Sequence, residues 1–353
     1  MRVIQLGPFP PPYGGVQANL VAIREYLCKL GIDNGVINLT RHRGASGNGL
    51  FYPNSATETA ALLLKLPARI FHLHIGGTVP FRVAALALLC NAIPGRKTVL
   101  TFHSGGYSSS PQGRAAKRAS FLGFVFRRFD RIIVVNQELA ALFRCFGVPN
   151  QRIRLILPHF VDHADIASSL PQPFDSFFAE HNPVLTTVGL LEPEYDLPLQ
   201  IDVLGRIREV IPSAGLIIIG SGSLEQKLRG IIKAKPYGRH VLLAGDVEHP
   251  VSLRVIRDSR VYLRTTLYDG DAVSVREALS LGTPIIATDN GMRPAGVQLI
   301  PISDSKELEE AILNELSNTP VRSRLDDSGI ENLQQVVRLY RELDPEILPS
   351  NRP

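Results

Sequence analysis

The sequence predicts an α/β protein made of two Rossmann-like, doubly wound domains with a ligand-binding cleft between them. Short apolar strands alternate with amphipathic helices, which is the pattern of parallel sheets covered by helices. Glycine-rich breaks follow many of these strands, at the carboxyl ends where such sheets bind ligands. The 353 residues are enough for two cores, and we interpret Pro171-Gln172-Pro173 as the linker. We therefore expect domains at 1–170 and 171–325, and a helix in 326–353 that could cross back to the first domain.

The first domain is expected to contain six strands and four main helices. Its strands are apolar runs that end in polar or glycine-rich residues: Val3–Leu6, Asp33–Leu39, Ile70–Ile75, Thr98–His103, Arg131–Val135 and Ile153–Leu157. Its helices show apolar residues at helical spacing: Val16–Leu30, Val83–Asn91, Arg114–Phe129 and Glu138–Phe146. His72 and His74 alternate on one strand, so they share a face, and we favour core or edge packing for them over a place in the cleft.

The loop after the first strand is a candidate phosphate site. Its prolines exclude a helix, and Gly14 and Gly15 then open the first helix. Glycines at a helix start let the backbone approach a phosphate closely, although a simple helix entry would use the same residues. The spacing is not GxGxxG, so an ordinary dinucleotide-binding dehydrogenase is disfavoured.

The second domain repeats the alternation. Its expected strands are Val184–Val188, Gly215–Ile219, Val241–Leu243, Val261–Arg264 and the apolar residues within Gly282–Asp289. Its expected helices are Leu197–Val210, Leu224–Ile232, Val251–Asp258, the segment around Ala272–Leu279, and the closing helices Leu308–Leu316 and Gln334–Leu343.

The segment Tyr268–Asp289 carries the strongest chemical signal. Asp269 lies in a loop and Glu277 stands eight residues later, about two turns inside the following helix. Between them, the backbone N–H groups of Ala272 to Ser274 begin the helix and can bind an anion. Two carboxylates for hydroxyl groups and one phosphate site suit a sugar nucleotide. A capped helix with solvated acids is the alternative.

Composition and charge limit the partners. Hydrophobic residues make up 44% and charged residues 20% of the chain, as in ordinary globular proteins, and no apolar run approaches the ~18 residues that span a membrane. Three cysteines without CxxC spacing indicate reduced, buried thiols in the cytoplasm. Residues 1–170 hold 19 Lys/Arg and 7 Asp/Glu, a charge of +12, whereas the remainder carries −7. The basic half could face nucleic acid, an anionic membrane or an anionic substrate.

The motif Glu277-Ala-Leu-Ser-Leu-Gly-Thr-Pro-Ile-Ile-Ala-Thr-Asp289, preceded by the acidic pair, resembles glycosyltransferase family 4, the retaining sugar-nucleotide transferases of the GT-B fold. The resemblance covers nearly the whole chain. The variant Asp-Gly-Asp-Ala-Val-Ser-Val-Arg-Glu, with Arg293-Pro294 downstream, resembles a subgroup of this family that is found in bacterial polysaccharide clusters. The family resemblance implies transfer of a sugar from a nucleoside diphosphate sugar to a glycan or lipid-linked acceptor, with the first domain on the acceptor side.

The resemblance also implies roles for individual residues. Glu277 would accept hydrogen bonds from the ribose hydroxyls, Asp269 would reach hydroxyls of the donor sugar, and His103 would lie beside the transferred sugar; these three form the expected catalytic set. The expected donor-binding residues are Gly14, Gly15, Gly189, Gly220, Gly222, Val247, Arg264, Gly270, Asp271, Ala272, Val273, Ser274 and Arg276. Asp269-Gly270-Asp271 looks like a DxD metal motif, but that motif belongs to a different fold, and we expect neither a metal ion nor another cofactor.

One departure from the family concerns the cations that neutralise the diphosphate. Leu190 stands where the family usually has Arg, and Tyr195 where it has Lys. A single lost electrostatic donor beside a leaving group costs ~3–4 kcal/mol. Either Arg264, Arg276 and Arg293 substitute, which we favour, or the chain is weakly active or inactive. A sugar-nucleotide epimerase or hydrolase, and a non-catalytic sugar-nucleotide-binding partner, are therefore alternatives.

The basic stretch Arg114–Arg131 surrounds an aromatic centre. This pattern suits peripheral contact with an anionic membrane, although a solvated helix face would also carry such charges. We expect a cytoplasmic protein, with the inner face of the cytoplasmic membrane as a candidate site. Nucleic acid is not expected to be a partner, because no reading motif accompanies the charge.

Overall fold

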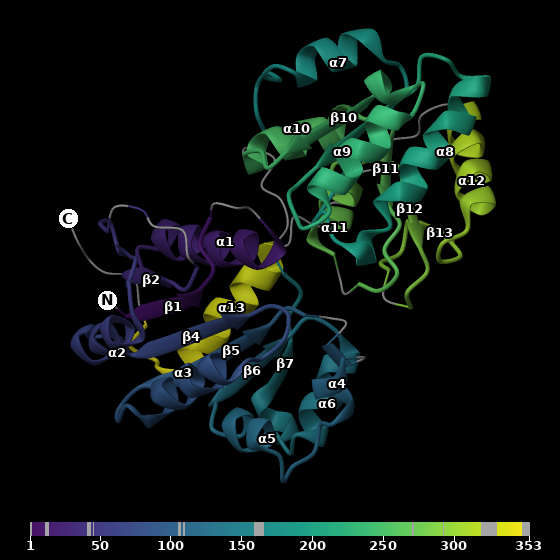
Figure 1. Ribbon diagram of the computed structural model, residues 1–353. Helices are drawn as coiled ribbons and strands as arrows, with labels where there is room; N and C mark the ends of the chain where they lie inside the picture. Colours follow the sequence, from purple (N-terminus) through teal and green to yellow (C-terminus); the bar gives the residue numbers. More distant parts are fainter. Residues whose placement is uncertain are drawn as a thin grey trace. The chain divides into compact units, whose positions relative to one another are not determined.

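The computed structural model describes residues 2–10, 14–40, 44, 46–104, 107–108, 110–158, 166–269, 272–291, 293–318 and 330–347. The chain divides into two compact units (Figure 1). Unit 1 comprises Met1–His159 and Gly329–Pro353, and unit 2 comprises Phe160–Ser328. The division lies before the expected linker. Pro171 instead belongs to unit 2, where its carbonyl accepts a hydrogen bond from the amide of Phe174 at the start of α7.

Unit 1 contains a parallel sheet whose described strands lie in the order β3-β2-β1-β4-β5-β6-β7. The strands are β1 (Val3–Gly7), β2 (Asn34–Asn38), β3 (Leu50–Phe51), β4 (Ile70–Ile75), β5 (Lys97–Phe102), β6 (Arg131–Val134) and β7 (Ile153–Leu155). The α-helices are α1 (Gly15–Lys29), α2 (Ala56–Lys65), α3 (Phe81–Ala92), α4 (Pro111–Arg114), α5 (Phe121–Phe126), α6 (Gln137–Cys145) and α13 (Ile330–Leu343).

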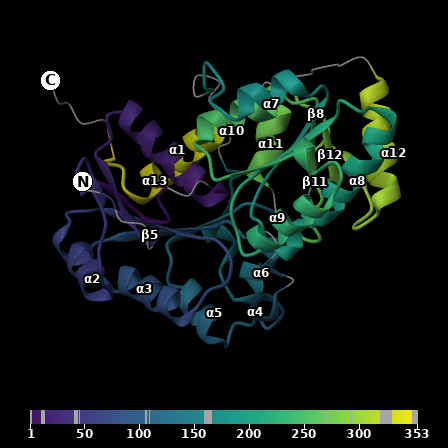
Figure 2. The same ribbon diagram turned by 45° about the horizontal axis from the view of Figure 1, so that its top comes forward.

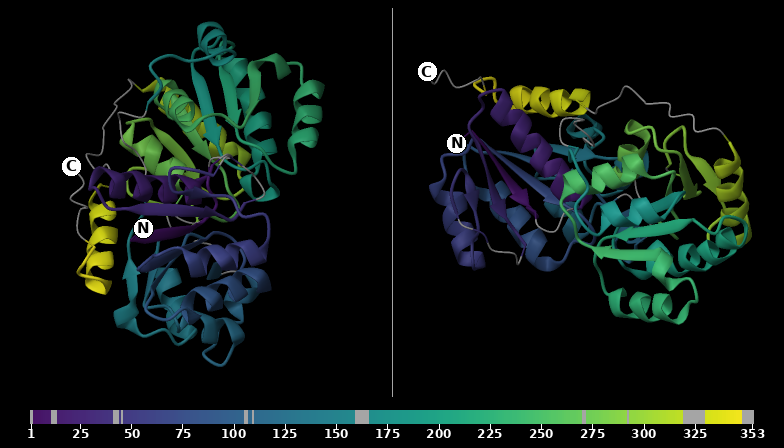
Figure 3. Two further views of the ribbon diagram at one scale, coloured as in Figure 1. Left: turned by 90° about the vertical axis from the view of Figure 1, so that its left-hand side faces the viewer. Right: turned by 90° about the horizontal axis from the view of Figure 1, so that it is seen from above.

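The C-terminal helix α13 completes one face of this sheet. It packs beside α1 (Figure 3), and their apolar residues form one core with Val3, Ile70 and Val99. The opposite face packs against residues of α3, α5 and α6. His72 lies fully buried on the α13 side, where Nδ1 bonds the Tyr340 hydroxyl at 2.5 Å and Nε2 bonds Thr101 Oγ1 at 2.6 Å. The last helix is therefore an integral layer of unit 1.

Unit 2 contains a second parallel sheet, with its described strands in the order β10-β9-β8-β11-β12-β13. These are β8 (Val184–Val188), β9 (Gly215–Ile219), β10 (Val241–Gly245), β11 (Val261–Arg264), β12 (Ile285–Thr288) and β13 (Gln298–Ile300). The α-helices are α7 (Phe174–Glu180), α8 (Leu197–Val210), α9 (Glu225–Ala234), α10 (His249–Asp258), α11 (Val273–Ser280) and α12 (Ser305–Ser317). Cores lie on both faces, with α8, α9 and α12 on one and α7, α10 and α11 on the other (Figure 2).

The prediction of one basic helix over Arg114–Phe129 is wrong. Helix α4 ends at Arg114, where the predicted helix begins, and the short helix α5 lies inside the predicted range. Ser110 and Ser120 cap the amino ends of α4 and α5 by accepting hydrogen bonds from the amides of Gly113 and Gly123, each at 3.0 Å. A serine cap starts a new helix because its side chain satisfies an otherwise unpaired amide. A Cβ at Gly113 would meet the Tyr107 carbonyl at 2.1 Å, so only glycine allows this tight packing.

Two further expectations concern the cysteines and the membrane. Cys90 is buried, but Cys28 and Cys145 are exposed, so burial was predicted wrongly for two of the three. Within the described ranges, no helix combines the length and the apolar character needed to cross a membrane.

Candidate functional site

The carboxyl ends of β8 and β9 carry two loops that interleave through backbone contacts. The Gly189 amide donates to the Ile219 carbonyl at 3.0 Å, and the Leu191 amide donates to the Ser221 carbonyl at 3.0 Å. A Cβ at Gly220 would lie 1.8 Å from the Gly189 carbonyl oxygen, and its φ of 133° is one that glycine alone adopts readily. The predicted donor-binding glycines therefore allow the loops to approach each other.

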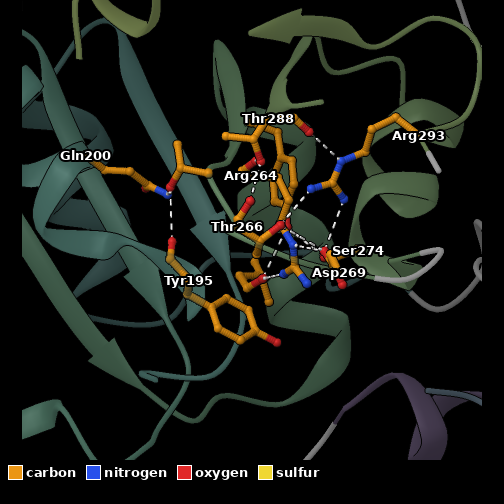
Figure 4. A network of polar contacts seen from close by, with 11 residues as sticks. Tyr195, Gln200, Arg264, Thr266, Asp269, Ser274, Thr288 and Arg293 are labelled. Carbon is orange, nitrogen blue, oxygen red and sulfur yellow. Dashed lines mark hydrogen bonds and ion pairs between the residues drawn. The ribbon is translucent and has the colours of Figure 1, made fainter. Parts of the chain in front are cut away.

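Three charged side chains meet at the end of β11 (Figure 4). Arg264 Nε donates to Asp269 Oδ2 at 2.8 Å, and Arg293 Nη1 donates to the same oxygen at 3.0 Å. The side chains of Arg264, Asp269 and Arg293 are 6%, 15% and 2% exposed. Burial alone would raise the pKa of Asp269, but the two guanidiniums hold that pKa below its ordinary value. Two cations on one carboxylate give this cluster a net charge of +1.

Neighbouring groups hold both arginines in place. Arg264 Nη1 donates to the Val188 carbonyl at 2.9 Å, and its guanidinium lies 4.6 Å from the centre of the Tyr195 ring. Arg293 Nε donates to the Thr288 carbonyl at 3.1 Å, and Nη2 donates to Thr266 Oγ1 at 2.7 Å. Tyr195, in the position where the resemblance implies a lysine, thus packs on one of the two arginines.

Glu277 lies on α11 and is almost fully buried, at 4% exposure. Its Oε1 is 2.7 Å from His249 Nε2, at the first residue of α10. A buried carboxylate needs such a partner because an unpaired charge is costly to remove from water. His249 was not predicted from the sequence; the only signal is its place just after the Asp246-Val247 loop, whose Asp246 Oδ2 accepts a hydrogen bond from Ser221 Oγ at 2.7 Å.

Among the residues that the structure describes, none caps the amino end of helix α11 with its side chain. Ala272 precedes the helix and offers no capping group, and Val273 is its first residue. Ser274 Oγ is 2.7 Å from the Tyr262 hydroxyl. Gly270 and Asp271 lie outside the described residues. Arg276 is half-buried, and Arg264 and Arg293 both reach Asp269.

Three of the predicted residues, Gly14, Gly15 and His103, belong to unit 1. Gly14 and Gly15 open α1, again with no side-chain cap. His103 follows β5, and its Nε2 is 3.2 Å from His74 Nδ1. Burial lowers the pKa of His103 to about 3, so the ring is neutral. The prediction that His74 serves core packing was therefore incomplete, because it also contacts His103.

Two family models together match most of the chain. A family model described as Glycosyltransferase Family 4 matches residues 13–165, and one described as Glycosyl transferases group 1 matches residues 170–332. An uncharacterized glycosyltransferase of Methanocaldococcus jannaschii is 25% identical over 169 residues, 47% of this chain and 41% of its own length. Phosphatidyl-myo-inositol mannosyltransferase of Mycobacterium leprae is 26% identical over 165 residues, 42% and 43% of the two chains. The chain thus spans about two fifths of the length of these curated relatives.

Solved structures resemble the whole chain. HepE of Anabaena in complex with UDP has a TM-score of 0.65 and 15% identity over 98% of both chains. Sucrose-phosphate synthase of Thermosynechococcus elongatus has a TM-score of 0.71 and 17% identity, covering 97% of this chain and 99% of its own. At these identities the likeness establishes the fold alone.

Proposed function

The chain belongs to the family 4-like glycosyltransferases of the GT-B fold, and from this premise we propose that it is a retaining, hexosyl-type transferase. It moves a sugar from a nucleoside diphosphate sugar to a glycan or lipid-linked acceptor in polysaccharide biosynthesis. The observation that carries the proposal is the buried Arg264–Asp269–Arg293 cluster. Its surplus positive charge has been removed from water, so it favours an anionic ligand.

The leaving group of such a reaction is a nucleoside diphosphate, which gains negative charge as the glycosidic bond breaks. Preorganised cations beside that charge stabilise the transition state more than the ground state. In this proposal Arg264 and Arg293 replace the cations that are absent at Leu190 and Tyr195. Asp269 orients both guanidiniums in addition to its expected contact with sugar hydroxyls.

The other residues bind the nucleoside diphosphate sugar and orient it. The Glu277 carboxylate accepts hydrogen bonds from the ribose hydroxyls, and His249 holds that carboxylate in place. The uncapped amides at the start of α11 bind phosphate oxygens, and His103 contacts the transferred sugar. Acceptor and leaving group lie on one face of the sugar, with no protein nucleophile assigned, so catalysis is orientation plus electrostatic stabilisation. We propose that neither a metal ion nor another cofactor is needed.

The test is a thermal-shift screen of nucleotide sugars, including the UDP-glucose bound in a HepE structure, followed by turnover assays with and without acceptors. A ligand bound by the folded state at a hundred times its Kd stabilises it by about 2.7 kcal/mol. We expect a donor that stabilises the protein and releases nucleoside diphosphate only with an acceptor, equally in EDTA. Donor turnover without acceptor would instead indicate an epimerase or hydrolase, and binding without turnover a non-catalytic partner. Stabilisation by no nucleotide sugar would refute the proposal.

We also propose a peripheral membrane contact through unit 1, at the cytoplasmic face. Phe81 on α3 and Phe121 on α5 are 77% and 47% exposed, with their rings stacked at 5.9 Å. Residues 111–129 contain five Lys/Arg and no Asp/Glu. Exposed aromatic rings among basic groups suit the headgroup region of an anionic bilayer, where each Lys or Arg contributes about 1 kcal/mol.

The double variant Phe81→Ser, Phe121→Ser should bind phosphatidylglycerol-containing vesicles at least about tenfold more weakly, because each lost phenylalanine removes about 1.5–3 kcal/mol of apolar burial. Vesicle co-sedimentation measures this, and Leu64→Ser on α2, where the side chain is 63% exposed, is the matched control. Equal binding of the wild-type protein to phosphatidylcholine vesicles, or unchanged binding of the double variant, would rule the contact out.

A further inference from the structure

A line of buried polar side chains crosses three neighbouring strands of unit 1. The strand order β1-β4-β5 places Gln5 beside β4, with its Cα paired to that of His72, and places His74 opposite Thr101. Side chains alternate between the faces of a sheet, so Gln5 and His74 lie on one face, beneath α1. Both are buried, at 0% and 3% exposure.

The hydrogen bond that Gln5 donates to α1 determines the direction of the other hydrogen bonds in this line. Gln5 Nε2 donates to the Leu20 carbonyl of α1 at 3.3 Å, which orients the amide so that Oε1 faces His74. His74 Nε2 lies 3.1 Å from that oxygen and must therefore carry a proton. A neutral imidazole has only one N–H, so His74 Nδ1 is bare and accepts from His103 Nε2 at 3.2 Å.

Both rings are neutral. Burial lowers the pKa of His74 well below its ordinary value, and the adjacent His72 and His103 lower it further. Burial likewise lowers the pKa of His103 to about 3. Packing holds the His74 ring: its centre is 4.1 Å from that of His72, and a Cβ at Gly7 would approach His74 Cβ to 3.0 Å.

We propose that Gln5 and His74 are positioning residues that hold His103 in the Nε2–H tautomer, so that His103 Nδ1 accepts a hydrogen bond from a hydroxyl group of the ligand. Within the described part of the chain, His103 Nδ1 makes no hydrogen bond of its own. A sugar hydroxyl is the matching donor. This last step rests on the proposed function, whereas the tautomer itself does not.

The tautomer can be read directly from the protein without substrate. Two-bond ¹H–¹⁵N correlation spectra of histidine-labelled protein show which ring nitrogen bears the proton, and a His103→Asn variant assigns the signal. We expect Nε2–H at His103 in the wild-type protein. In Gln5→Met, which has nearly the same volume but no acceptor, His74 is expected to turn its proton toward His103 and produce the Nδ1–H form there. An Nδ1–H wild-type His103, or an unchanged tautomer in Gln5→Met, would overturn the proposal.

Kinetics supply the second measurement. Gln5→Met should lower kcat/KM for donor turnover about tenfold, the effect of about one hydrogen bond, with little change for a donor analogue that lacks the contacted hydroxyl. Tyr340→Phe is the matched control, since it removes a buried hydrogen bond from His72 on the same sheet face but leaves the Gln5–His74–His103 line intact. Its kcat/KM per folded molecule should stay within about twofold of wild type. An equal loss of kcat/KM in both variants would mean that the Gln5–His74–His103 line has only a structural role. If the wild-type protein turns over no donor, the proposed function fails while the tautomer result stands.

Discussion

Replacement of Arg264 by Met is expected to lower the rate of sugar transfer by about a hundredfold or more. The Arg264 guanidinium bonds Asp269 and is almost fully buried, so its charge is weakly screened and acts strongly on a nearby diphosphate. Loss of one such electrostatic donor costs about 3–4 kcal/mol in the transition state. Arg264→Lys should recover only part of the activity, because an ammonium group cannot reproduce the planar fork that bonds both Asp269 and the Val188 carbonyl.

The matched control lies just before the same strand. Arg260, just before β11, is 15% exposed and pairs with Glu315 at 2.8 Å. Arg260→Met therefore breaks a comparable ion pair at the amino end of the strand, away from the ligand-binding edge. It should lower the thermal stability while kcat per folded molecule stays within about twofold of wild type. Single-turnover rates on the folded fraction compare the two variants, and equal losses in both would remove Arg264 from the proposed mechanism.

Much of the fold was predictable because it depends on local patterns. The strands β8, β9 and β11 and the helix α8 match their predicted bounds to the residue. Each of these strands is almost fully buried, so its apolar run begins and ends sharply in the sequence. The edge strand β13 was missed because it is only three residues long and two of them are exposed. Helix α2 was also missed, although Ser55 and Glu58 form a readable capping signal at its start.

The site was predictable only in part, because its pairings join segments far apart in the chain. Asp269 and Glu277 share one motif, so the sequence singled them out together. Which arginines reach Asp269 depends on β11 and β12 lying side by side, and that neighbour relation comes from the strand order. The pairing of His249 with Glu277 requires α10 and α11 to pack together. Gln5 reads as one more residue of a buried strand until the order β1-β4-β5 is known.

The second large effect of a substitution is expected at the pair of Glu277 and His249. Glu277→Ala is expected to weaken binding of the nucleoside diphosphate sugar about a hundredfold, since hydrogen bonds to a charged group contribute about 1.5–3 kcal/mol each and two ribose hydroxyls are available. The loss should be specific to the ribose. Calorimetry with a ribonucleotide donor and its 2′-deoxy analogue should show clear preference for the ribose form in wild type and almost none in the variant. Wild-type affinity in Glu277→Ala would contradict the assignment.

His249→Gln tests whether the histidine acts through Glu277. Without its partner at 2.7 Å, the buried carboxylate can adopt other rotamers, so donor affinity should fall by about tenfold. The double variant Glu277→Ala, His249→Gln should then bind no more weakly than Glu277→Ala alone, because the histidine has nothing left to orient. Additive losses would instead mean that His249 contacts the nucleotide itself. Such a result would enlarge the binding site while leaving the role of the Glu277 carboxylate unchanged.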